Sequence, residues 1–329
     1  MRFYLKRLWR YSCSCLGRLG RRVYLQRLIF TRWNMYKPYP YRFRELLDAS
    51  APINPLAKHH LPDIEIAIPS TKKDLPLLKL VIESAVTSCI NKVNKVRIVV
   101  PPHEVKEFEQ YVLRENLQSL NIEIINESDL LGNYLHLCES VAPSSRRGWL
   151  IQQVIKFLCA AKSASAGVLI IDSDTILLQP RAWLSDKGIQ LLMMSLEYHP
   201  PYQEHYMEFQ RSFSGLTKIE CSPAVSFVTH HQLMQPFLVK KMFGGESSWT
   251  EGLEKWINLV NFKEFSPACE YHSYGTFVST QFRHLCEEAR WGNRSISRSK
   301  FENQFTRSQL KRITRSEPDA LSISFHSYL

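Results

Sequence analysis

The sequence lacks several features that would place it in a large class of proteins. No apolar run reaches the roughly 18–20 residues that a membrane-spanning helix needs, so a transmembrane protein is not expected. Its eight cysteines form no CxxC pair and have no regular spacing, which argues against a zinc site or a disulfide framework. There is no low-complexity tract and no repeat of solenoid length. A globular protein remains, and its 44% hydrophobic content can fill one large core or two modest ones.

The first 44 residues have no acidic side chain. They contain 12 Lys or Arg residues, which accounts for the whole net charge of +11. A nucleic-acid-binding protein would carry its basic residues on the folded domain, so no nucleic-acid partner is expected. Here they are interleaved with Trp, Phe and Leu, a pattern typical of helices that lie on anionic membranes. We predict a basic amphipathic segment at residues 1–45, with membrane contact, packing on the protein itself and a basic tail as open alternatives.

From residue 62 onward, strand patterns alternate with helix patterns. Ile64, Ile66 and Ile68 alternate with two other residues in a predicted strand that ends at Pro69, and Asp74 is the predicted N-cap of the helix that follows. Further strands are predicted at 95–102, 121–129 and 168–171, and further helices at 103–116 and 147–165. Such alternation implies parallel pairing. The predicted fold class is therefore α/β, a Rossmann-type layered α/β/α sandwich with a mostly parallel central sheet.

The second half of the chain is less regular. Strands are predicted at 189–197, 222–232 and 320–329, and helices at 232–243, 248–261 and 276–290. A linker rich in Pro and Tyr is predicted at 46–61, between the basic segment and the folded domain at 62–329.

Two aspartates, Asp172 and Asp174, follow the apolar strand 168–171 directly. Ligands of such sheets bind beyond the carboxyl ends of the strands, and residues two apart on an extended chain point the same way. Two carboxylates on one face repel each other unless a cation lies beside them. Oxygen ligands suit Mg²⁺ or Mn²⁺, which complete their shell with phosphate and water. The pair therefore predicts a metal site for a phosphorylated ligand, with an Asp that stabilises a turn as the structural alternative.

The strand, the Asp-x-Asp and the apolar segment that ends at Pro180 resemble the DxD motif of GT-A-fold glycosyltransferases. Several ordered stretches also resemble a bacterial family of GT-A-type glycosyltransferases without assigned function: IAIPSTKKDLPLL, RGWLIQQVIKFLCA, VLIIDSDTILLQP, SPAVSFVTHHQLM and CEYHSYGTFV. The resemblance covers residues 62–329 and implies a GT-A-like domain. Its nucleotide-binding half would be 62–180 and its acceptor half 181–329.

The resemblance also implies a nucleotide-sugar donor, a UDP-sugar first, and Mn²⁺ or Mg²⁺. Pro69, Ser70 and Lys73 would lie against the nucleotide at the end of the first strand. Gln152 and Lys156 would face the diphosphate from a helix, although a solvated polar helix face explains both residues equally well.

For the reaction itself, the resemblance implies that Asp172 lies near the ribose and sugar and, with Asp174, contacts the metal. His326 would be a further metal ligand, and a surface histidine near the chain end is the alternative. Glu270 is the candidate that takes a proton from the acceptor hydroxyl, and a Glu paired with a neighbouring Arg or Lys is the alternative. His272 stands where the family pattern has a second acid, and could be a base near neutral pH.

The leading hypothesis is a metal-dependent glycosyltransferase that acts on a glycan or lipid-linked acceptor, as in surface polysaccharide synthesis. Its expected location is the cytoplasm, with residues 1–44 as a contact to the inner membrane face. A haloacid-dehalogenase-type phosphohydrolase would also use an Asp-x-Asp, but no later strand ends in the acidic pair that it needs. A non-catalytic protein that binds nucleotide or glycan is the third hypothesis. Adjacent histidines on a strand point to opposite faces, so His230 and His231 are predicted to be structural.

Overall fold

The structure is a computed structural model that describes residues 47–48, 61–195, 200–216, 226–264, 266–298, 308, 310, 312 and 320–326. All of these belong to one compact unit, Leu47–Leu329. The predicted basic segment at 1–45 and almost all of the predicted linker at 46–61 lie outside the described residues. Within the described part of the chain, no helix has both the length and the apolar content of a membrane span.

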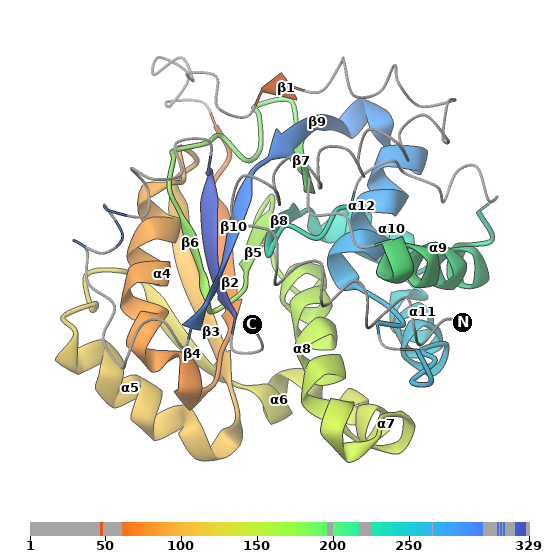
Figure 1. Cartoon of the computed structure of the whole chain (residues 1–329), viewed down its shortest axis with the longest axis horizontal. Coiled ribbons are helices and arrows are strands. Elements are labelled where there is room, and N and C mark those ends of the chain that lie inside the picture. The colour runs from red at the N-terminus through yellow and green to blue at the C-terminus, as the bar shows by residue number, and fades with distance from the viewer. Residues whose placement is uncertain are drawn as a thin grey trace, which may run out of the picture. The chain divides into compact units, whose positions relative to one another are not determined.

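The central sheet has five strands in the order β4-β3-β2-β5-β8 (Figure 1). They are β2 (Ile64–Pro69), β3 (Val93–Val100), β4 (Ile122–Asn126), β5 (Val168–Ile171) and β8 (His231–Met234). The first four pair in parallel, and β8 runs antiparallel to β5 at the edge. The predicted α/β class with a mostly parallel central sheet is confirmed.

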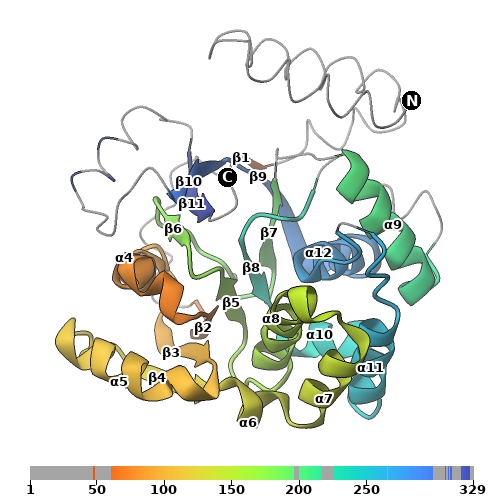
Figure 2. The same ribbon diagram turned by 60° about the horizontal axis from the view of Figure 1, so that its bottom comes forward.

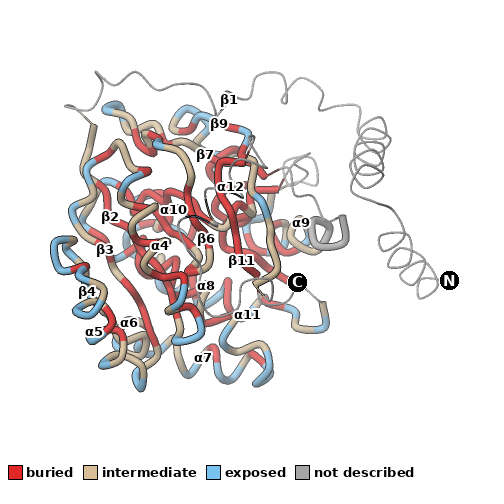
Figure 3. The backbone as a smooth tube through the Cα atoms, turned by 60° about the vertical axis from the view of Figure 1, so that its left-hand side comes forward, coloured by how far each residue is buried: buried red, intermediate tan, exposed pale blue. Residues whose placement is uncertain are grey.

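Helices cover both faces of this sheet. The helices α4 (Leu75–Thr87) and α5 (Val105–Arg114) lie on one face, and α8 (Ser144–Ala161) lies on the other (Figure 2). The alternation in β2 explains this arrangement, because Ile64, Ile66 and Ile68 join the buried core that includes α4. Buried residues are concentrated in the strands and the adjoining helix faces (Figure 3).

Six further helices and three short 3₁₀ turns are present among the described residues. They are α6 (Glu127–Leu131), α7 (Asn133–Val141), α9 (Pro200–Ser214), α10 (Pro236–Met242), α11 (Trp249–Asn258) and α12 (Glu270–Gln281), with short 3₁₀ turns η2 (Lys72–Asp74), η3 (Pro102–Glu104) and η4 (Arg283–Leu285). Close packing fixes α12, because a Cβ on Gly275 would lie 2.3 Å from the Phe227 side chain.

Two three-stranded sheets are also present among the described residues. One has the order β10-β11-β6 and the other β1-β9-β7. Their strands are β6 (Thr175–Leu177), β10 (Asn293–Ser297) and β11 (Ser322–His326), and β1 (Leu47–Asp48), β7 (Gln190–Ser195) and β9 (Cys286–Trp291). Because β6 continues from β5 and pairs with β11, the end of β11 lies beside the residues that join β5 to β6.

Several predictions for the second half were wrong in secondary-structure type. The predicted helix at 276–290 ends at Gln281, and 286–291 forms β9 against β7. The predicted helix at 232–243 begins only at Pro236, because the residues before it pair with β5. Of the described residues 226–232 of the predicted strand at 222–232, only the last two belong to β8. The helix predictions fail because strand pairing with a segment distant in the sequence determines the secondary structure here. Local hydrophobic periodicity contains no information about such pairing.

Candidate active site

Asp172, Ser173 and Asp174 form a turn between β5 and β6. The backbone N–H of Thr175 donates to the carbonyl of Asp172 at 2.9 Å, so the extended geometry that we expected here is wrong. The chain must turn because β6 leaves the central sheet to pair with β11. As a result the three side chains diverge: Asp172 meets α8 and α12, Ser173 meets the start of α4, and Asp174 meets the end of β11.

The Asp172 carboxylate is held by three side chains. Its Oδ1 accepts hydrogen bonds from Lys156 Nζ at 2.6 Å and from the Tyr271 hydroxyl at 2.8 Å. Its Oδ2 lies 3.1 Å from His230 Nδ1. Burial favours the neutral acid, but Lys156 and His230 outweigh burial and keep the pKa of Asp172 well below its ordinary value. Asp172 is therefore a fixed anion with three of about four acceptor positions filled.

Lys156 bridges two carboxylates in the interior. Its Nζ lies 2.6 Å from Asp172 and 2.5 Å from Glu270 Oε1, and its side chain is 4% exposed. The ammonium also lies over the Tyr271 ring, 4.3 Å from the centroid. Burial opposes the charged form, yet the two carboxylates more than offset it and raise the pKa of Lys156 above its usual range. Lys156 therefore stays a cation.

Two helices supply this cluster. Gln153 and Lys156 occupy one face of α8, and the backbone N–H of Glu270, at the start of α12, donates to Gln153 Oε1 at 3.1 Å. Glu270 is thus buried and ion-paired, which is the alternative that the sequence left open for it. Gln152 is half-buried on the same helix, and its neighbour Gln153 makes the contact to α12 instead.

His230 belongs to the site, although the sequence predicted a structural role. It precedes β8, and the pairing of Ile171 with His231 sets it opposite Asp172, whose backbone N–H donates to the His230 carbonyl at 2.9 Å. Its φ is +64°, in the left-handed region that few residues other than glycine occupy. Nothing in the local sequence pattern reports this backbone conformation, so sequence reasoning missed the residue.

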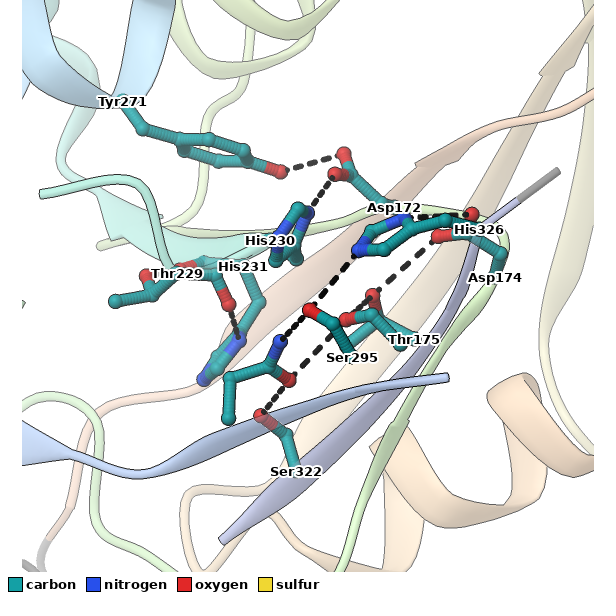
Figure 4. Close-up of polar contacts among 12 residues, drawn as sticks. Asp172, Asp174, Thr175, Thr229, His230, His231, Tyr271, Ser295, Ser322 and His326 are labelled. Atoms are coloured by element: carbon teal, nitrogen blue, oxygen red, sulfur yellow. Dashed lines mark hydrogen bonds and ion pairs between the residues drawn. The ribbon is translucent and has the colours of Figure 1, made fainter. Parts of the chain in front are cut away.

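Asp174 and His326 form a second pair beside the first. His326 Nδ1 lies 3.7 Å from Asp174 Oδ2, and the side chains are 5% and 22% exposed respectively. Strand pairing fixes this approach, because Phe325 N–H donates to the Asp174 carbonyl at 2.9 Å. The rings of His230 and His326 are adjacent, with centroids 4.7 Å apart, and the two aspartates border them (Figure 4). His326 is therefore a buried residue of the site, not a surface histidine.

These donors fit a divalent cation only in part. Among the described residues, no group of three or more His, Cys, Asp or Glu side chains is arranged to hold a metal. Mg²⁺ typically takes one or two protein carboxylates and completes its shell with substrate phosphates and water. Asp174, which is partly open, and His326, which is buried beside it, fit a cation that is shared with a phosphorylated ligand. Asp172, already engaged by three donors, fits a direct metal contact less well.

The residues predicted to face a nucleotide lie at the end of β2. Pro69 is the last residue of β2, and the neighbouring Ser70 is buried. The buried hydroxyls of Ser70 and Thr71 make no hydrogen bond to the described residues. Lys73 is exposed in η2 and does not join the Asp172 or Asp174 contacts described above.

Two other histidines are neutral in the interior. His231 packs between Trp183 and Trp291, and His272 lies against Phe227. Burial lowers the pKa of each to about 3. The expectation that His272 could act as a base near neutral pH is therefore wrong.

Comparison with solved structures finds distant similarity to glycosyltransferases. Mouse xyloside xylosyltransferase 1, in its apo form, is 12% identical, with 81% of this chain and 98% of that chain covered and a TM-score of 0.43. The galactosyltransferase LgtC, in complex with donor and acceptor sugar analogues, is 11% identical, with 79% and 86% covered and a TM-score of 0.42. An active-site mutant of LgtC is 13% identical with the same coverage and a TM-score of 0.45. These similarities are too distant to identify an activity.

Comparison of sequences gives a family. No curated protein matches the chain. The sequence model of a "Family of unknown function (DUF6492)" matches residues 65–281, about two thirds of the chain, and these residues include β2 from its second residue, the Asp172–Asp174 turn and all of α12. The chain therefore belongs to this family of unknown function.

Proposed function

We propose that this protein is a metal-dependent glycosyltransferase that moves a sugar from a nucleotide-sugar donor to a glycan or lipid-linked acceptor. One observation carries the proposal: a fixed carboxylate, Asp172, and a partly open one, Asp174, meet two adjacent histidines at the carboxyl end of β5. This is the edge of a parallel sheet at which ligands bind. The resemblance of residues 168–180 to a DxD segment supports the same conclusion.

The residues have different roles in this proposal. Asp174 and His326 would hold the cation, and Asp172 would face the ribose and sugar of the donor. Lys156, Tyr271 and His230 keep Asp172 ionised and oriented before any ligand arrives. When bound, a divalent cation offsets the charge that develops on the leaving nucleoside diphosphate.

Glu270 has an indirect role in this proposal, through its ion pair with Lys156. Its carboxylate is buried and paired with Lys156, so it is not open to an acceptor hydroxyl. In this proposal it acts by keeping Lys156 charged and in place. Pro69, Ser70 and Lys73, at and after the end of β2, would lie against the nucleotide, and Gln152 on α8 would face the diphosphate.

Calorimetry with UDP, GDP, CDP and dTDP, each with and without Mn²⁺, tests the proposal. We expect metal-dependent binding of one nucleotide, UDP first, and its loss in Asp174→Ala, because the cation bridges the protein and the diphosphate. Asp186→Ala, which removes an exposed aspartate at another turn, is the matched control and should bind normally. Absence of nucleotide binding under every metal condition, or release of phosphate from simple phosphate esters, would contradict the proposal.

The acceptor and the location are also part of the proposal. A lipid-linked or surface glycan acceptor is supported by the 12 basic residues among the first 44, which suit an anionic membrane. The full chain should therefore sediment with phosphatidylglycerol vesicles and not with phosphatidylcholine vesicles. If the same fraction of the protein sediments with both kinds of vesicle, the proposed contact with an anionic membrane is wrong.

A further inference from the structure

The serine between the two aspartates is tied to a buried carboxylate on another element. Ser173 Oγ donates to Asp74 Oδ2 at 2.6 Å, and both residues are only 4% exposed. We expected Asp74 to cap α4. It occupies the N-cap position, but its side chain makes no capping hydrogen bond. The carboxylate is engaged in tertiary contacts instead.

The other Asp74 oxygen binds an arginine from the far end of the chain. Arg298 Nη2 lies 2.8 Å from Asp74 Oδ1, and Arg298 Nη1 donates to the Lys73 carbonyl at 3.2 Å. Arg298 directly follows β10. The ion pair therefore attaches the end of β10 to the start of α4, in a partly buried position where charge pairing is stronger than at the surface.

The end of β10 in turn sets the place of His326. Ser297 pairs with His326 across the parallel β10–β11 ladder, and Ser295 Oγ lies 3.2 Å from His326 Nε2. Asp74 is thus connected to both proposed metal ligands, Asp174 and His326. One connection runs through Ser173 to the adjacent Asp174, and the other runs through Arg298 and β10 to His326.

We propose that Asp74 is a positioning residue that sets the approach of Asp174 to His326, and so the affinity of the site for its cation. The inference rests on the proposed function. Residues that orient metal ligands from behind typically contribute about 10- to 100-fold to metal affinity. A neutral side chain at position 74 would break the ion pair with Arg298. A Ser173 substitution would remove only the hydrogen bond between the 172–174 turn and Asp74.

Electron paramagnetic resonance of Mn²⁺ in the presence of UDP tests this role, since it reports the bound cation and not activity. We expect Asp74→Asn to weaken Mn²⁺ binding at least about tenfold, and Ser173→Ala to weaken it by a smaller factor. Arg298→Gln should resemble Asp74→Asn, because it breaks the same ion pair. Asp63→Asn, which breaks the exposed Asp63–Lys92 pair, is the matched control and should bind as the wild type does.

The outcomes separate the two proposals. If the wild-type protein binds no Mn²⁺ with any nucleotide, the proposed function fails. If it binds Mn²⁺ and Asp74→Asn binds equally well, the positioning role is wrong while the function stands. A lower melting temperature with unchanged Mn²⁺ affinity would also overturn the positioning role, because it would show a structural contact alone. Should Asp74→Asn not fold, Ser173→Ala and Arg298→Gln decide the same question.

Discussion

Replacement of Lys156 by methionine is expected to destabilise the folded protein by about 3–5 kcal/mol. The ammonium lies 2.6 Å from Asp172 and 2.5 Å from Glu270. Without it, the buried Glu270 carboxylate and the partly buried Asp172 carboxylate would have no cation between them, and one of them would have to take up a proton. The free energy of unfolding from urea titration, measured at pH 7, gives the size of the effect.

A double variant separates charge from packing in this prediction. Lys156→Met with Glu270→Gln removes the cation together with one of its two anions, so it should recover part of the lost stability. Coupling of this kind is expected between residues in direct contact. A Lys156→Met protein within about 0.5 kcal/mol of the wild type, the range of ordinary surface substitutions, would contradict the buried charge cluster itself.

Asp174→Ala and His326→Ala are each expected to lower turnover of the donor by about 10²–10³-fold. A divalent cation supplies several kcal/mol of charge stabilisation to a leaving diphosphate, and each 1.36 kcal/mol corresponds to a factor of ten. The Asp174 side chain is 22% exposed and lies 3.7 Å from His326, a longer contact than those of Asp172, so this variant should lose little stability. Steady-state release of nucleoside diphosphate from the donor that calorimetry identifies provides the measurement.

The comparison variant for this effect is Asp186→Ala, which should turn over as the wild type does. A different pattern is expected for Asp172→Asn, because loss of that charge disturbs Lys156 as well as the donor. It should lose both stability and turnover. Turnover of Asp174→Ala within tenfold of the wild type would show that the cation, if present, is held elsewhere.

The sequence predicted those parts of the site that depend on local pattern. Alternation in β2 and the apolar run of β5 placed two strand ends correctly, and the helical spacing of α8 placed Lys156 on one face with Gln153. The importance of residues 172–174 was visible because two carboxylates after a buried strand are unusual. These features need no knowledge of distant partners.

Features that depend on pairing between distant segments were not predictable. The turn at 172–174 exists because β6 pairs with β11, some 150 residues later, and His230 faces Asp172 only because β8 pairs with β5. The Asp74–Arg298 pair joins residues 224 positions apart. An isolated Asp or Arg in a sequence gives no sign of such a partner. Local pattern therefore pointed to the candidate site, and pairing between distant segments determined which residues surround it.

The central claim is that Asp174 and His326 hold a divalent cation. Anomalous diffraction at the manganese edge, from crystals grown with Mn²⁺ and UDP, tests it most directly. We predict a single peak within bonding distance of the Asp174 carboxylate and the His326 imidazole, with Asp172 still bound to Lys156. A bound nucleotide with no such peak, or a peak on other residues, would contradict the account.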